Sequence, residues 1–248
     1  MAVYFYRYYG LRIAYAKFTE KPEDIPKVSR AYYDLCFNQT DDPSFKKRPL
    51  WRTAVDLNMQ DDELYHSFNG TARANINRGR KDGITTKINS DYANAIEFAR
   101  RFYKVKRLQL LEPALQLLLK DSNETEFKSK SGILVNAYHK GMMIQGLYFL
   151  IGKDRMAPEM VSAYRAFDNS YDRLCSEAVR LCYFDGMCYA RDNGIKKEIN
   201  TIGSDINNPD SIGKFKLGFG GVVFQDYNYV KDFNPILKVL DKLGIRRF

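Results

Sequence analysis

A lysine flanked by phenylalanines and glycines stands near the C-terminal end of the chain. Residues 215–221 read FKLGFGG and run into a strand-like Val-Val-Phe. Glycine tolerates positive φ and has no Cβ, so this backbone could approach a ligand closely while Lys216 supplies a cation. The alternative interpretation is a turn or bulge that enters a strand, with both phenylalanines in the core.

A second set of polar side chains lies on a helix predicted over residues 70–82. Arg73, Asn77 and Arg80 are spaced i, i+4 and i+7 and therefore share one stripe of that helix. Arginine presents a fork of donors that can grip a phosphate or a carboxylate. A solvated charged face is the other interpretation of the same pattern.

A tyrosine hydroxyl is the third candidate. A strand is predicted over residues 158–167, and the period of two places Ser162, Tyr164 and Ala166 on one side of it. Tyr164 could lend its hydroxyl to a substrate or a leaving group. It could equally be a core tyrosine whose hydroxyl is satisfied internally.

The small number of histidines limits the catalytic mechanisms that this chain could use. The chain contains only His66 and His139, and its four cysteines form no CxxC pair, which argues against a zinc site. No Ser/His/Asp constellation is legible, and a nucleophilic triad needs a histidine held by a third group. Direct transfer of an activated acyl group to an amine fits better, because it requires alignment, a donor for the developing oxyanion and a proton route.

The elements that would position these residues follow the order β-β-β-α-β. A turn at residues 139–141 predicts a hairpin, and the long helix connects two strands that could lie parallel. The predicted elements are strands over residues 132–138, 142–151 and 158–167, a helix over 170–193, a strand over 195–202, and then a polar loop before FKLGFGG.

The preceding part of the chain is more varied. Residues 3–18 are rich in tyrosine and phenylalanine and predict two short strands around a turn. A helix is predicted over residues 26–37, and the polar, proline-bearing stretch at 38–49 predicts an exposed loop. Two further helices are predicted over residues 90–103 and 113–120.

This order of elements resembles the GNAT acyltransferase superfamily, and within it the Fem-type peptidoglycan aminoacyltransferases and related N-acyltransferases. Five motifs in order over residues 50–248 carry the resemblance. They are VDL at 55–57 before an acidic helix start, RANI at 73–76 with RKDGI at 80–84, ARDNG at 190–194, FKLGFGG, and Asn234-Pro235 before a last helix.

The resemblance implies an α/β (α+β) fold with a mixed, mostly antiparallel central sheet flanked by helices. Residues 51–248 would form the GNAT-like domain, and residues 1–50 would be an extension left from a reduced first GNAT domain. The implied activity is transfer of an aminoacyl or acyl group to an amine of a cell-envelope or sugar-linked precursor. Lys216 and Tyr164 would be catalytic, and substrate would contact Arg73, Asn77, Arg80, Phe215, Gly218, Phe219 and Gly220.

The resemblance implies an acyl donor only through a motif that the sequence lacks. No Q/R-x-x-G-x-G/A loop follows the third strand, and its absence is typical of Fem-type enzymes, which use aminoacyl-tRNA. An acyl-CoA donor is the alternative, and a non-catalytic RNA- or precursor-binding module is the third hypothesis. The net charge of +9 suits tRNA or another phosphate-bearing partner.

The composition indicates a folded protein without a membrane span. With 45% hydrophobic residues the chain can bury a core, and no apolar run approaches the ~18 residues needed to cross a bilayer. We therefore expect a cytoplasmic protein with no tightly bound cofactor and no metal. Peripheral membrane contact and a homodimer stay open.

Overall fold

The computed structural model describes residues 2–8, 11–106, 132–235 and 237. It divides into two compact units, residues 1–50 with 225–248 and residues 51–224. The sequence-based domain ran from 51 to 248, whereas the residues from Gln225 onward group with the first 50. The helix predicted over 113–120 and the last helix after Pro235 lie outside the described residues.

The first unit contains a four-stranded arrangement in the order β1-β2-β3-β10. The predicted pair of strands within residues 3–18 is confirmed, and β2 pairs parallel to β3. The helix predicted over 26–37 is wrong, because β3 pairs on both sides with distant segments and Tyr33 enters a small core. The bounds are β1 Ala2–Tyr8, β2 Leu11–Lys17, β3 Arg30–Asp34 and β10 Val222–Asp232.

The second unit is built on a mixed, mostly antiparallel sheet with the order β4-β9-β8-β7-β6-β5. Among the described residues of this unit, β8 and β9 are the one pair of neighbouring strands that run parallel. The expected strands and hairpin are present, and β4 begins inside the predicted loop at 38–49. The bounds are β4 Lys46–Asp56, β5 Thr85–Ile88, β6 Gly132–His139, β7 Met142–Ile151, β8 Arg155–Ala163 and β9 Lys197–Gly203.

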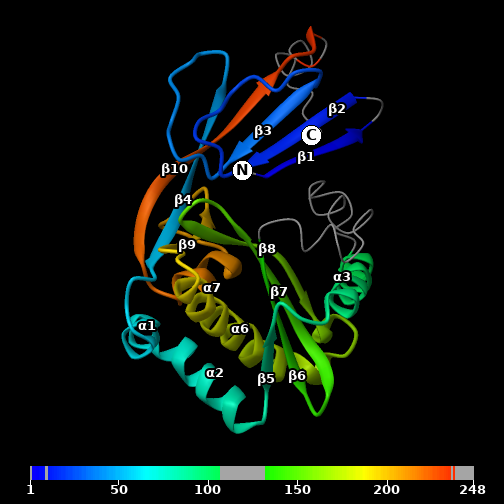
Figure 1. Cartoon of the computed structure of the whole chain (residues 1–248), viewed down its shortest axis with the longest axis vertical. Coiled ribbons are helices and arrows are strands. Elements are labelled where there is room, and N and C mark those ends of the chain that lie inside the picture. Colours follow the sequence, from blue (N-terminus) through cyan, green and yellow to red (C-terminus); the bar gives the residue numbers. More distant parts are fainter. Residues whose placement is uncertain (1, 9–10, 107–131, 236, 238–248) are drawn as a thin grey trace. The chain divides into compact units, whose positions relative to one another are not determined.

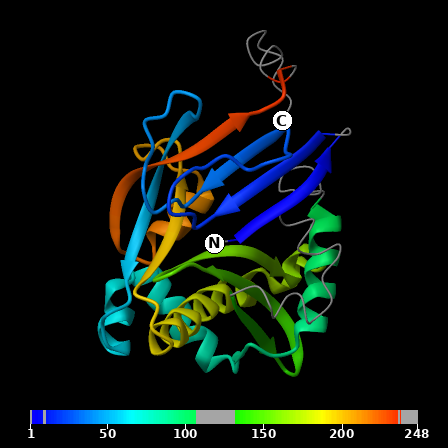
Figure 2. The same ribbon diagram turned by 45° about the horizontal axis from the view of Figure 1, so that its top comes forward.

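Helices cover this sheet. α6 packs on β6 and β7 and runs beside α2, while α3 contacts β7 and β8 (Figures 1 and 2). α6 reaches the sheet closely because Gly186 has no side chain: a Cβ there would lie 2.8 Å from the ring of Phe149. The bounds are α1 Asp61–Ser67, α2 Gly70–Lys81, α3 Tyr92–Lys106, α6 Asp172–Asp192 and α7 Ser211–Leu217.

Two local predictions fail near the candidate site. The third strand ends at Ala163, so that Tyr164 lies in the 3-10 turn η2, Tyr164–Ala166, rather than on a strand face. The predicted polar loop ends at Asp210, and α7 then begins and includes the first three residues of FKLGFGG. Asp210 is the N-cap of α7, and its carboxylate accepts a hydrogen bond from the backbone N–H of Gly213 at 2.6 Å. Among the described helices, none is long and apolar enough to cross a membrane.

Candidate functional site

Lys216 lies on α7 and reaches back to β9. Its Nζ donates a hydrogen bond to the backbone oxygen of Thr201 at 2.9 Å. α7 can lie this close because Gly213 faces β9: an added Cβ would be 2.7 Å from the backbone oxygen of Ile202. The Asp210 cap and Gly213 together therefore position the ammonium group over the strand.

Buried polar side chains lie on β9 and the adjacent strand β4. Glu198 and Asn200 are fully buried at alternate positions of β9, and Thr53 lies opposite Asn200 on β4. Asn200 Nδ2 donates to Glu198 Oε2 at 2.5 Å. Glu198 Oε1, Asn200 Oδ1 and Thr53 Oγ1 have no hydrogen-bond partner in the described part of the chain, which is costly for buried polar atoms.

Glu198 lies close enough to Lys216 for the two charges to interact. Burial raises the pKa of Glu198 to about 8, although the Lys216 charge and the hydrogen bond from Asn200 act in the opposite direction. The pKa of Tyr183 on α6 is also raised, first by burial and then by Glu198. Because the pKa of Glu198 is about 8, its carboxyl group can take up or release a proton near neutral pH.

The two phenylalanines of FKLGFGG have different surroundings. Phe219 is fully buried and stacks on Tyr183 with ring centroids 4.2 Å apart. Phe215 is half-buried and lies under the guanidinium of Arg180 at 4.9 Å. Phe219 thus packs in the core of the unit, which differs from the expected contact with substrate, whereas Phe215 keeps an accessible side.

The glycines of this segment pack against the protein's own backbone. The Gly218 oxygen accepts from the Asn69 N–H at 2.9 Å, and a Cβ on Gly220 would lie 2.5 Å from the Ser67 oxygen. Both glycines were expected to let a ligand approach. In this structure they instead let the turn after α7 fit against the loop between α1 and α2.

The stripe on α2 lies beside α1. Asn77 and Arg80 line a pocket of about 430 Å³, and the Arg80 guanidinium is 5.3 Å from the ring centroid of Phe184. Arg73 lies outside this pocket and donates to the His66 backbone oxygen at 3.3 Å. The other residues that line the pocket are Asp61, Asp62, Tyr65 and Phe184.

The pocket and the Lys216 region meet through the core. The ring of Phe68 is 6.0 Å from that of Phe184, which lines the pocket, and 5.2 Å from that of Phe219. Tyr164 is placed differently: its ring packs on Tyr171 at 4.9 Å. Tyr164 thus lies in an aromatic cluster with Phe167 and Tyr171, whereas Lys216 lies over β9.

Sequence reasoning missed the buried polar group on β9. Glu198 and Asn200 alternate along a segment that was predicted to be a strand, and such alternation of polar residues in a buried strand is a usable signal. Thr53 carries no comparable signal, because only strand pairing places it opposite Asn200.

β9 pairs with β8 over only a short stretch. Its parallel ladder with β8 contains two residue pairs, Arg155 with Lys197 and Met156 with Glu198. Beyond Glu198 these two described strands are no longer paired with each other, so the edge of β9 that faces β8 is not used by that ladder. Lys216 and the buried polar group lie at this part of β9.

The chain matches no protein-family model and no curated protein. The crystal structure of FemX is similar with a TM-score of 0.56 and 14% identity, covering 77% of this chain and 63% of FemX. The C-terminal domain of a putative lysylphosphatidylglycerol synthetase from Agrobacterium fabrum is similar with a TM-score of 0.52 and 14% identity. The match covers 94% of this chain and 81% of that domain.

A conserved protein of unknown function from Bacteroides thetaiotaomicron VPI-5482 is similar with a TM-score of 0.53 and 12% identity, covering 77% of this chain and 62% of that one. This chain therefore spans less than two thirds of FemX and of the Bacteroides protein. At such identities the likeness concerns the fold. The chain has a GNAT-like fold of the Fem type, as its motifs predicted.

Proposed function

We propose that this protein is an N-acyltransferase that moves an aminoacyl or acyl group to an amine of a cell-envelope or sugar-linked precursor. One observation carries the proposal: Lys216 is held over β9 beside the buried Glu198, where β8 and β9 cease to pair. The fold shared with FemX supports the reaction class. Arg73, Asn77 and Arg80 remain proposed contacts of the acceptor, and Phe215 a contact beside the lysine.

The chemistry requires one bond to form and one to break. The acceptor amine attacks the acyl carbonyl, a C–N bond forms, and the C–O bond of an ester or the C–S bond of a thioester breaks. The Lys216 ammonium would stabilise the charge that develops on the carbonyl oxygen or on the leaving group. The ionised form of Glu198 would accept the proton that the amine loses, and a pKa of about 8 makes that carboxylate a stronger base than an ordinary one.

Aminoacyl-tRNA is the proposed donor. The segment after β8 forms the turns η2, Tyr164–Ala166, and η3, Asn169–Tyr171, and contains no glycine before α6. This supports a donor other than acyl-CoA, whose pyrophosphate is held by a glycine-rich loop in ordinary GNAT enzymes. The net charge of +9 supports a phosphate-bearing partner, and a cytoplasmic location would give access to charged tRNA.

The test is a transfer assay with the Lys216→Ala variant. Purified protein is incubated with charged tRNA or acyl-CoA and with UDP-linked amino-sugar or peptide acceptors, and products are measured by mass spectrometry. We expect Lys216→Ala to lower turnover about 100-fold or more, as loss of an electrostatic stabiliser does. Lys214→Ala, an exposed lysine of the same helix, should keep wild-type turnover.

Three results would contradict the proposal in different ways. Wild-type turnover in Lys216→Ala would remove the site assignment. Transfer from acyl-CoA alone would replace the proposed donor with the alternative one. Binding of tRNA or precursor without transfer from any donor would favour the non-catalytic module.

A further inference from the structure

Three acidic residues open α1, and each has different surroundings. Glu63 accepts a hydrogen bond at 3.0 Å from the backbone N–H of the residue that caps the helix. Asp61 forms an ion pair with Arg191 at 2.6 Å. The Asp62 carboxylate is 87% exposed, and within the described chain it pairs with Nδ1 of His66 at 3.3 Å. Asp62 therefore keeps most of its hydrogen-bonding capacity for another partner.

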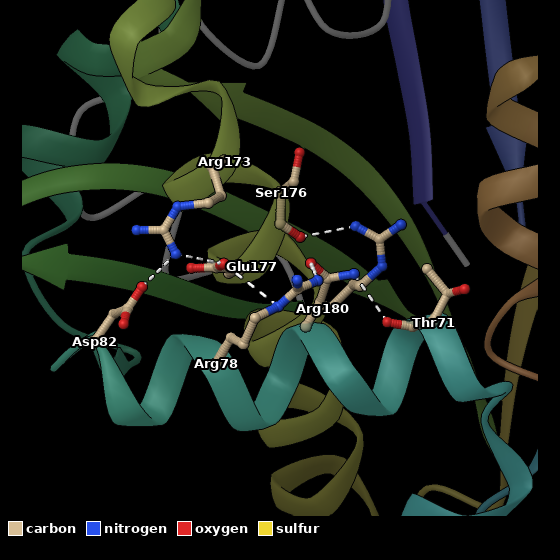
Figure 3. Close-up of polar contacts among 8 residues, drawn as sticks. Thr71, Arg78, Asp82, Arg173, Ser176, Glu177 and Arg180 are labelled. Atoms are coloured by element: carbon tan, nitrogen blue, oxygen red, sulfur yellow. Dashed lines mark hydrogen bonds and ion pairs between the residues drawn. The ribbon is translucent and has the colours of Figure 1, made fainter.

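The arginines of α2 divide in the same way. Figure 3 shows Arg78 and Arg173 directed at the buried Glu177, from which they lie 3.8 Å and 2.9 Å away. The side chain of Arg80 on the same helix is 51% exposed, and its Nη2 lies 3.9 Å from Asp185, which is longer than a hydrogen bond. Within the described part of the chain its guanidinium donates no hydrogen bond. Arg80 thus has donors available for a ligand.

Asp62 and Arg80 line one pocket, which lies among α1, α2 and α6. Its volume of about 430 Å³ is within the range of small-ligand sites. Asn77 is exposed on its α2 side and makes no hydrogen bond to a described residue. Tyr65 and Phe184 form an aromatic wall with ring centroids 6.0 Å apart, and the Arg80 guanidinium lies 5.3 Å from the Phe184 centroid. The pocket therefore combines hydrogen-bond donors, a carboxylate and an apolar wall.

We propose that this pocket binds the amino-acid group of a small ligand, with the ligand's carboxylate on Arg80 and Asn77 and its ammonium on Asp62. A guanidinium fork matches a carboxylate in two parallel hydrogen bonds, and a carboxylate beside an aromatic ring suits an ammonium. A ligand with negative charge alone would be repelled by Asp61 and Asp62, and one with positive charge alone would be repelled by Arg80. A zwitterion avoids both repulsions.

The pocket also bears on the substrate of the proposed transferase. Asn77 and Arg80 are proposed contacts of the acceptor, so the inference that the acceptor carries a free amino-acid end rests on the proposed function. The buried ring of Phe68 lies between Phe184, which lines the pocket, and Phe219 of the FKLGFGG segment. An ammonium held in the pocket would therefore be distinct from the amine that receives the acyl group. Binding of the zwitterion can be measured without an acyl donor and without turnover.

The experiment is calorimetric titration of the full chain with L-alanine and, separately, with Nε-acetyl-L-lysine. Both carry the amino-acid group, and the second presents it at the end of a longer chain. We expect saturable binding at one site per chain that weakens as salt is raised. Ethylamine and propionate carry one of the two charges each and should bind at least about tenfold more weakly, since each loses a charge-assisted contact.

Variants assign the binding to the pocket. Arg80→Ala and Asp62→Asn should each weaken binding about tenfold or more, because each removes the partner of one ligand charge. Lys81→Ala removes an exposed cation from the next position of α2, and Glu97→Gln removes an exposed anion from α3. Both controls lie outside the pocket lining and should change binding less than about twofold. Since Asp62 is exposed, Asp62→Asn tests the site even if Arg80→Ala fails to fold.

Three results overturn the proposal. They are absence of saturable binding of both zwitterions, binding of ethylamine or propionate as tight as that of alanine, and wild-type affinity in folded Asp62→Asn. Binding of alanine without Nε-acetyl-lysine supports a free amino acid as the ligand and removes the link to a larger acceptor. Acyl transfer without zwitterion binding would refute this inference and leave the proposed function standing, and zwitterion binding without transfer would do the reverse.

Discussion

At the scale of single residues, Glu198 shows how a strand position can acquire a proton-transfer role. Its side chain is fully buried, one carboxyl oxygen is held by Asn200, and the other has no described partner. Burial disfavours the charged form more than Lys216 favours it, and so the pKa rises to about 8. The group is therefore largely protonated at neutral pH and close to its titration point.

This raised pKa predicts a pH-dependent stability. Between pH 4.5 and 8 the folded chain holds the Glu198 proton and the unfolded chain has released it, so stability is full below this range and falls as the pH rises through it. Compared with Glu198→Gln, the wild type should lose about 1.4 kcal/mol of unfolding free energy per pH unit in that window. Urea unfolding at several pH values measures the difference.

The control for this prediction is Glu97→Gln, which alters an exposed glutamate of α3. Its unfolding free energy should run parallel to that of the wild type. If Glu198→Gln also runs parallel, Glu198 ionises normally in the folded chain and cannot serve as the proposed proton acceptor.

At the scale of elements, the turn after α7 depends on its glycines for packing. Gly220 and Gly221 have φ of 77° and 90°, and added Cβ atoms would lie 2.5 Å from the backbone oxygens of Ser67 and Ala54. Only glycine fits both the backbone conformation and the space. This turn therefore joins α7 to the α1–α2 loop and to β4, and keeps Lys216 over β9.

Gly220→Ala should consequently destabilise the protein more than a glycine substitution that meets no neighbour. Gly83 also has φ of 77°, but a Cβ there has nothing within 4 Å. We expect Gly83→Ala to cost about 1 kcal/mol from strain, and Gly220→Ala to cost about 1–3 kcal/mol more from the clash. Thermal and urea unfolding of both variants give the comparison, and equal losses would show that the turn tolerates a side chain.

At the scale of the whole molecule, the chain returns to its first unit after completing the second. β10 begins in residues 51–224 and ends in the unit that contains residues 1–50. Inside that unit the buried pair Arg30 and Asp232 is joined at 2.5 Å, and Lys46 approaches Asp232 at 3.3 Å. These contacts tie the C-terminal end of β10 to β3 and to the start of β4.

Asp232→Asn should therefore destabilise the first unit strongly. Removing the carboxylate breaks the buried ion pair of Arg30, a change that typically costs about 3–5 kcal/mol. Asp24→Asn breaks an exposed ion pair with Lys231 in the same unit and should cost at most about 1 kcal/mol. Hydrogen exchange of β2 and β3 amides reports on both variants, and equal protection in the two would contradict the assigned role of the buried pair.

Much of the fold was predictable because local signals agreed with the final structure. α6 shows a helical apolar stripe, and the hairpin between β6 and β7 has Lys140 and Gly141 at positive φ, as its turn sequence indicated. The segment at residues 26–37 was misjudged because β3 is stabilised by pairing with β2 and β10, which are distant in sequence. α7 was missed because it is short and its cap follows a proline-containing loop.

The sequence by itself determined the fold type, the order of most elements and the choice of Lys216, since these depend on composition, periodicity and short motifs. Only the tertiary structure decided what surrounds that lysine. Glu198, Asn200 and Thr53 meet through strand pairing, and Lys216 lies over β9 because α7 packs against that strand. Burial and long-range proximity set their charge states and partners, and neither can be read from neighbouring positions along a chain.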